Sequence, residues 1–112
     1  MVRACELRAR VLKALAHPTR IALLEMMQNG PICACEVVDR SGLSQPSVAR
    51  HLAVLRESQV IASRREGVRV LYEVVDPRVF QLLELVSSVV HDRFRESMRA
   101  MGMDSQGRNE GR

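Results

Sequence analysis

The three cysteines have the most specific chemistry in this chain, and two of them stand one residue apart. Cys33 and Cys35 fall within one tripeptide shortly after Pro31, and Cys5 lies near the N-terminus. A thiol can fill a core, form a redox pair, or bind a soft metal as thiolate. The spacing by itself leaves these three roles open.

The position of the pair favours reactive thiols. Residues two apart on a regular α-helix point about 200° away from each other, so a continuous helix would keep Cys33 and Cys35 from sharing one ion. Pro31 instead places them at a helix start. There the first turn can open, and the positive end of the helix dipole lowers the pKa of a thiol.

Length and composition predict one cytoplasmic domain. The chain has 112 residues, of which 46% are hydrophobic, enough for one core. Residues 1–10 lack the apolar region of a secretory signal, and no apolar run approaches the roughly 18–20 residues that span a bilayer, so no secretion and no membrane partner are expected. Cytoplasmic thiols stay reduced, and an odd cysteine count argues against a disulfide framework. Residues 1–101 should form the domain and 102–112 a disordered tail.

The charge pattern is compatible with nucleic-acid binding. Lys13 is the only lysine among 17 basic residues, and the net charge is +4. Arginine suits bidentate contacts to phosphate and guanine, although a codon bias also produces an arginine excess. With one Tyr, two Phe and no Trp, the chain lacks the aromatic platform of single-strand binders.

Helical periodicity and turn signals predict a helix-turn-helix. The predicted helices cover residues 3–17, 18–28, 31–42 and 44–58. The last two are joined by a tight turn after Gly42, and Ser44 is a good N-cap. Val48, Leu52 and Leu55 form the buried stripe of the second helix. Its exposed polar side chains are the predicted DNA contacts: Ser44, Gln45, Ser47, Arg50 and His51. Arg50 suits a guanine or a phosphate, whereas His51 also suits a capping or packing role.

A β-hairpin is predicted directly after the helix-turn-helix, as the wing is in a winged-helix domain. Residues 60–75 alternate with period two around a turn at Glu66–Gly67. Arg64, Arg65 and Arg69 lie where phosphates or the minor groove would be met. Each is equally typical of a solvated surface charge, but the cluster indicates a DNA contact.

A last helix follows Asp76–Pro77, and its apolar residues cover more than half of its circumference. One small domain does not need so wide an apolar surface, which indicates a helix shared with a second subunit.

These residues together resemble the ArsR/SmtB family of bacterial winged-helix metal sensors. The matching phrases, spread over about residues 7–95, are LKALAHPTRIALLEMM, CAC and SGLSQPSVARHLAVLRESQVIASRREGVRVLYEV. The resemblance implies a mainly α fold with a β-hairpin, a winged helix-turn-helix of about five helices. It also implies a homodimer through the first and last helices. The function implied is repression of an operon by binding double-stranded operator DNA until an inducer arrives.

The resemblance further implies a soft-metal site. Family members that respond to arsenic, antimony, cadmium or lead carry Cys-x-Cys at this place, which makes Cys33 and Cys35 the expected ligands. In some relatives an N-terminal cysteine crosses to the other subunit, as Cys5 would here, unless Cys5 only fills space. Three thiolates suit trivalent arsenic or antimony, whereas tetrahedral zinc needs four ligands. Some arsenic-responsive members have a further cysteine one turn on, which is missing at 37–39.

A second metal site of the family uses Asp-x-His and a distant His-x-x-His or His-x-x-Glu on the last helix. Here Asp76 is followed by Arg78, and His91 by Phe94. Both ligand pairs are broken, so zinc, nickel or cobalt sensing at this helix is not expected.

The leading hypothesis is therefore a dimeric repressor that releases its operator when the thiols bind trivalent arsenic or antimony, with no catalytic cofactor. The alternatives are a thiol-redox or sulfide-responsive repressor, an architectural protein that no longer reads sequence, and a small thiol enzyme. The enzyme is disfavoured because no Cys-x-x-Cys and no acid–base constellation occurs.

Overall fold

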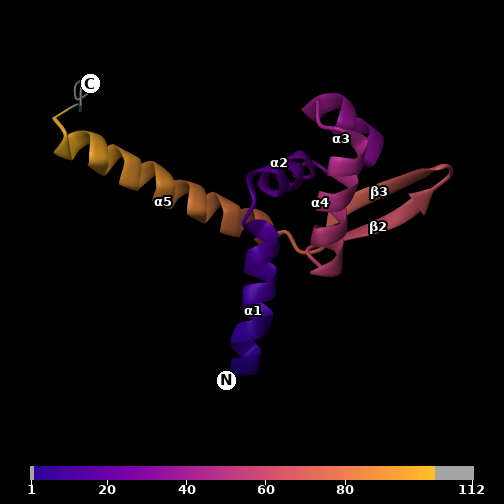
Figure 1. The fold of residues 1–112 in the computed structure, drawn as a ribbon, viewed down its shortest axis with the longest axis horizontal. Helices are drawn as coiled ribbons and strands as arrows, with labels where there is room; N and C mark the ends of the chain where they lie inside the picture. Colours follow the sequence, from indigo (N-terminus) through magenta and orange to yellow (C-terminus); the bar gives the residue numbers. More distant parts are fainter. Residues whose placement is uncertain (1, 103–112) are drawn as a thin grey trace. The chain divides into compact units, whose positions relative to one another are not determined.

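The computed structural model describes residues 2–102. Met1 and residues 103–112, which make up nearly all of the predicted tail, lie outside the described part. The elements are α1 (Val2–Leu15), α2 (Pro18–Met26), β1 (Ile32–Cys33), α3 (Ala34–Ser41), α4 (Gln45–Glu57), β2 (Ile61–Glu66), β3 (Arg69–Val74) and α5 (Arg78–Ala100) (Figure 1). The chain divides into two compact units, 1–80 and 81–112, which are described separately.

The first unit contains the predicted helix-turn-helix, formed by α3 and α4. Gly42 ends α3 in the left-handed conformation, with φ 75°, and its amide donates to the Val38 carbonyl at 3.1 Å. Ser44 then caps α4, because its hydroxyl accepts a hydrogen bond from the Ser47 amide at 3.2 Å. The predicted glycine stop and serine cap are both confirmed.

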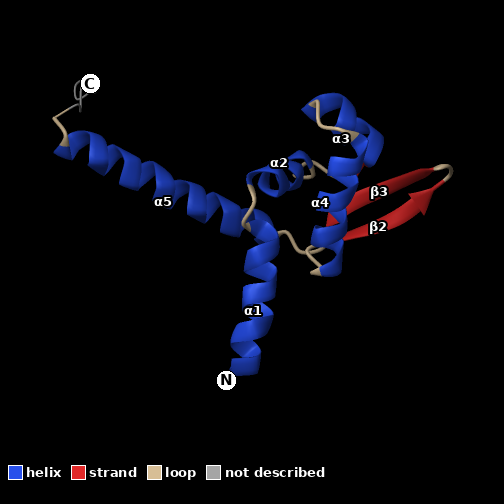
Figure 2. Ribbon diagram, in the orientation of Figure 1, coloured by secondary structure: helices blue, strands red, loops and turns tan. Residues whose placement is uncertain are grey.

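The predicted hairpin is present, and a third strand joins it. The sheet order is β1-β3-β2, with both pairings antiparallel. Figure 2 shows the hairpin of β2 and β3. Glu66 pairs with Arg69, so the two turn residues are Gly67 and Val68, one position later than expected. Gly67 has φ 66°, which favours glycine at this place.

The strand β1 corrects the prediction of one helix over 31–42. Ile32 pairs with Tyr72 and Cys33 with Leu71, so these two residues continue the sheet and the helix starts only at Ala34. They pair with β3, a strand far away in the sequence, which the local sequence does not reveal.

The core of the first unit fixes α4 in place. The side chains of Val48, Leu52 and Leu55 are buried, as predicted for the inner stripe of α4. They share the core with Leu23 and Leu24 of α2. Burying each such side chain is worth about 1.5–3 kcal/mol, so this packing sets which face of α4 remains outside.

The helix α5 begins as the sequence predicts, after Asp76 and Pro77, and Asp76 accepts a hydrogen bond from the Arg78 amide at 2.9 Å. None of its residues is buried. Its exposed large apolar side chains are Leu82, Leu85, Val86, Val89, Val90 and Phe94. Within residues 2–102, no helix is long and apolar enough to cross a membrane.

Candidate nucleic-acid interface and thiol pair

The outer face of α4 carries most of the predicted DNA-contacting residues. Ser44, Gln45 and Arg50 are exposed, and Ser47 is half-buried. These side chains come from the N-cap and first turns of the helix, outside the buried stripe, and Arg50 lies opposite that stripe. Hydroxyl, amide and guanidinium groups there have the chemistry to contact base edges and phosphates.

His51 differs from these residues because its ring makes contacts within the protein. It is half-buried, its ring centroid lies 4.5 Å from that of His17, and its Nδ1 lies 3.3 Å from Nη1 of Arg20. Burial lowers the pKa of His51 below 6.5, and its neighbours His17, Arg20 and Arg50 lower it further. These contacts fit a packing role, while contact with DNA stays a prediction.

The three predicted wing arginines are exposed but do not share one face. Opposite residues of an antiparallel pair lie on the same face and successive residues alternate, so Arg64 and Arg69 lie on one face and Arg65 on the other. Arg64 donates to Glu73 at 2.8 Å. In the part of the chain that the structure describes, Arg65 and Arg69 form no ion pair.

The two neighbouring cysteines are joined as a disulfide, with Cα atoms 5.4 Å apart. This corrects the expectation of free thiols at this place. Cys33 has extended backbone, with φ −94° and ψ 155°, whereas Cys35 lies in the first turn of α3. The change from strand to helix removes the angular separation of a regular helix and brings the sulfurs together. Cys33 is 3% exposed and Cys35 is exposed.

Cys5 is a free, exposed thiol on α1. Within residues 2–102, no three His, Cys, Asp or Glu side chains lie together as ligands for one metal ion. The structure therefore brings Cys33 and Cys35 together and does not add Cys5 of the same chain to them.

Asp76 is bound by the arginine two residues later. Its two carboxylate oxygens accept hydrogen bonds from the Arg78 guanidinium at 2.7–3.2 Å. These hydrogen bonds are the main reason why the pKa of Asp76 falls to about 2. Arg78, which stands where the Asp-x-His pattern has its histidine, thus binds the carboxylate of Asp76, the aspartate of the same pattern.

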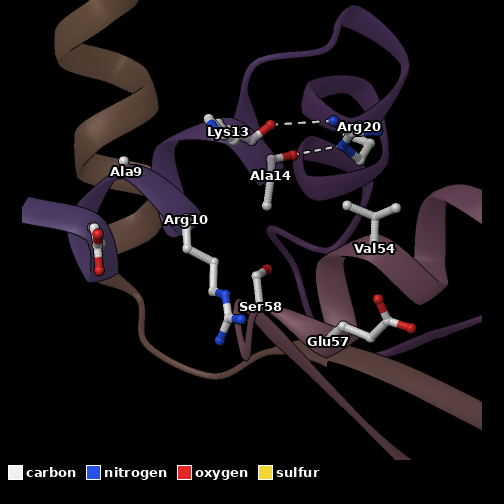
Figure 3. Close-up of a pocket in the computed structure, with 9 residues that line it drawn as sticks. Ala9, Arg10, Lys13, Ala14, Arg20, Val54, Glu57 and Ser58 are labelled. Atoms are coloured by element: carbon white, nitrogen blue, oxygen red, sulfur yellow. Dashed lines mark hydrogen bonds between the residues drawn. The ribbon is translucent and has the colours of Figure 1, made fainter. Parts of the chain in front are cut away.

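Sequence reasoning gave no role to Arg20, which the structure places at a junction of helices. Its guanidinium donates to the carbonyls of Ala14 at 2.6 Å and Lys13 at 3.2 Å, at the end of α1 (Figure 3). It lies at the wall of an open groove of about 550 Å³ between α1 and the end of α4. The HPTR phrase, residues 17–20, was the available signal, since its histidine and arginine both enter this junction.

A family model described as bacterial regulatory protein, arsR family, matches residues 17–63. The chain is 39% identical over 84 residues to a "probable mercury resistance operon repressor" of Streptomyces lividans, covering 75% of this chain and 67% of that protein. It is 33% identical over 82 residues to an uncharacterised helix-turn-helix transcriptional regulator of Methanocaldococcus jannaschii, covering 72% of this chain and 92% of that protein.

Three solved structures have a similar fold. A Mycobacterium tuberculosis protein has a TM-score of 0.77 at 29% identity, covering 85% of this chain and 96% of its own. A homodimeric winged helix-turn-helix DNA-binding domain from Mycobacterium bovis has a TM-score of 0.76 at 25% identity, covering 85% and 88%. Reduced HlyU from Vibrio cholerae has a TM-score of 0.69 at 28% identity, covering 80% and 94%.

Proposed function

Because the chain belongs to the arsR family of bacterial regulatory proteins, a family of DNA-binding transcriptional regulators and not of enzymes, we propose that it is a dimeric repressor controlled by its thiol pair. In this proposal it binds operator DNA in the cytoplasm while Cys33 and Cys35 are reduced and metal-free. It leaves the operator when these thiols bind a trivalent arsenic or antimony ion. The observation that carries the proposal is the meeting of the two sulfurs at the strand-to-helix junction before the recognition helix.

Operator binding is supported by the outer face of α4 and by the wing. The exposed side chains of Gln45 and Arg50 would enter the major groove, with Ser44 and Ser47 beside them. The wing arginines on the hairpin would contact phosphate or the minor groove. Arg64 and Arg69 lie on the same face of the hairpin and Arg65 on the other. Arg64 and Arg69 could therefore contact the same stretch of DNA together.

Dimerisation is supported by the exposed apolar residues of α5, which include Leu85, Val89 and Phe94. An apolar helix surface of this kind is normally covered by another protein surface. The similar M. bovis domain is described as homodimeric. The proposal is that a second copy of this chain covers the apolar residues of α5. A dimer would present two α4 helices to half-sites about one DNA turn, roughly 34 Å, apart.

The donor set fits a soft ion once the disulfide is reduced. Reduction yields two neighbouring thiols, and thiolate sulfur is the ligand type that soft metals select. Cys35 gives access from solvent. Since the described part of one chain offers no third ligand beside the pair, Cys5 of the second subunit is the proposed third sulfur. Among the relatives, the S. lividans protein is named for mercury resistance.

A redox-responsive repressor is the second candidate, and the Cys33–Cys35 disulfide is the observation that favours it. Forming this bond takes two electrons and two protons from the two thiols, which an oxidant such as a peroxide would accept. HlyU, one of the similar structures, is described in a reduced form.

Release of a fluorescent DNA fragment from the region upstream of the gene tests both candidates. Reduced wild-type protein should bind the fragment and release it on addition of arsenite. Cys33→Ser and Cys35→Ser should bind the fragment equally well and keep it, because serine has no soft thiolate. Cys5→Ser should need more arsenite. The metalloid proposal fails if both serine variants of the pair respond like wild type.

A parallel DNA-release experiment uses peroxide in place of arsenite, and alkylation measures whether the thiols are free or oxidised. Release that accompanies disulfide formation and is reversed by dithiothreitol supports the redox candidate. A protein that binds the upstream fragment no better than unrelated DNA contradicts sequence-specific repression.

A further inference from the structure

Three side chains meet where α1 ends, α2 begins and α4 passes, and we name Arg20, His17 and His51 the Arg20 cluster. Arg20 donates to the terminal carbonyls of α1 and approaches Nδ1 of His51 on α4 at 3.3 Å. The rings of His17 and His51 lie 4.5 Å apart, tilted by 46°. One guanidinium thus connects the end of α1 with the recognition helix.

The hydrogen bonds fix the protonation of both rings. A guanidinium has only donors, so Nδ1 of His51 must accept from Arg20 and the ring proton must sit on Nε2. In His17, Nδ1 accepts a hydrogen bond from the Thr19 amide at 3.1 Å and thereby caps α2. Both imidazoles are therefore neutral in this arrangement, since a protonated ring has no acceptor.

We propose that Arg20 and His17 are positioning residues, which hold neutral His51 and thereby fix the orientation of α4 for operator binding. Protonation of His51 removes its acceptor and places a cation against Arg20, so the link between α1 and α4 breaks. Operator affinity then falls on acidification. This inference rests on the operator binding proposed above.

The charged side chains that influence His51, Arg20 and Arg50, are both cations. The groups that influence it are His17 from the α1–α2 link, Arg20 from α2 and its neighbour Arg50 on α4. No acidic group among them stabilises an imidazolium, and burial together with these charges lowers the pKa of His51 below 6.5. The ring therefore takes up a proton only at a lower pH than an ordinary histidine does, and the link is lost as the pH falls through this lowered pKa.

The sign of the pH effect separates this role from a direct DNA contact. A histidine that binds phosphate does so better as a cation, so acidification would strengthen operator binding. A histidine that positions α4 as a neutral acceptor gives the opposite result.

The test compares wild-type protein with His51→Asn, which offers an amide oxygen near the place of Nδ1 and does not titrate. Operator affinity is measured by fluorescence anisotropy from about pH 7.5 to about pH 5.5, with reduced protein. The affinity of wild type relative to His51→Asn should fall about five- to tenfold on acidification, the equivalent of one hydrogen bond. Dividing the affinity of wild type by that of His51→Asn cancels the general strengthening of phosphate contacts at low pH, because both proteins share it. The exposed His91 provides the control, because His91→Asn should keep the wild-type pH profile.

Nitrogen NMR of the imidazole rings in the DNA-free protein gives a second readout. His51 should carry its proton on Nε2 and titrate below 6.5. A ratio that stays constant or rises on acidification overturns the inference, as does a His51 ring protonated on Nδ1 at neutral pH. If wild type binds no upstream DNA at any pH, operator binding is wrong, and the ring nitrogens alone decide whether His51 is a neutral acceptor.

Discussion

Cys33 lies directly opposite Leu71 in the sheet, and Leu71 lies opposite Arg64 on its other side. The thiol pair is therefore separated from a wing arginine by one strand. Cys33 and Leu71 are both buried. Because buried residues are close-packed, a shift of the backbone at Cys33 should displace its neighbours in β3 as well. This pairing gives the two cysteines a direct connection to the wing, besides the one through α3 to α4.

Reduction of the disulfide should therefore be detected in β3. We expect the backbone amide resonances of Val70, Leu71 and Tyr72 to shift when dithiothreitol is added to oxidised protein, because their strand pairs with β1. Amides of α2, which does not pair with β1, serve as the internal control. Shifts confined to α3, with β3 unchanged, would contradict coupling through the sheet.

Replacing Arg50 by alanine should weaken operator binding by about 1–3 kcal/mol if the guanidinium reads a base. Arg50 is exposed and opposite the buried stripe, so the free energy of unfolding should change little. Arg56→Ala, an exposed arginine in the last turn of the same helix, is the matched control. Equal losses on operator and unrelated DNA would show that Arg50 contacts only phosphate.

Loss of the Ser44 cap should destabilise the fold. Ser44→Ala removes the acceptor for the Ser47 amide and should lower the free energy of unfolding by about 1 kcal/mol. Ser44→Asp keeps an acceptor and should retain most of the stability. Urea denaturation without DNA measures this effect apart from any contact of Ser44 with the operator, and an unchanged Ser44→Ala midpoint would refute the cap.

The Asp76 carboxylate should remain ionised in unusually acidic solution. Its pKa is lowered from 3.8 to about 2, chiefly by hydrogen bonds from the Arg78 side chain. A lowered folded-state pKa stabilises the fold above the unfolded value of 3.8, and this contribution is lost as the pH falls through about 2. In Arg78→Gln the pKa should return towards 3.8, as measured by carboxyl carbon NMR. A pKa near 2 in that variant would assign the shift to another cause.

Local signals made the helices predictable. Gly42 in the left-handed conformation, Ser44 at the N-cap and the inner stripe of Val48 and Leu52 all follow from residues within one or two turns. The same holds for the α5 start at Asp76. Such features depend on neighbours in sequence, which periodicity and capping preferences describe well.

Features that depend on distant partners were not predictable from the sequence. The strand β1 has two residues and so no period of its own, and it exists because Tyr72 and Leu71 pair with it across a long sequence separation. The contact of Arg20 with His51 likewise joins residues 31 positions apart. Of the candidate site, the spacing pointed to Cys33 and Cys35, and the structure joins them as a disulfide. That disulfide state depends on redox conditions that the residues do not encode.

The unequal exposure of the two cysteines sets an order of events in thiol–disulfide exchange. Access decides which sulfur an incoming thiolate attacks, and Cys35 is exposed whereas Cys33 is 3% exposed. The attacking sulfur therefore bonds to Cys35, and the electron pair of the broken bond leaves on Cys33. A mixed disulfide trapped with a small thiol should be found on Cys35. Cys33, once its sulfur has taken up a proton, should remain a buried thiol until a second thiol completes the reduction.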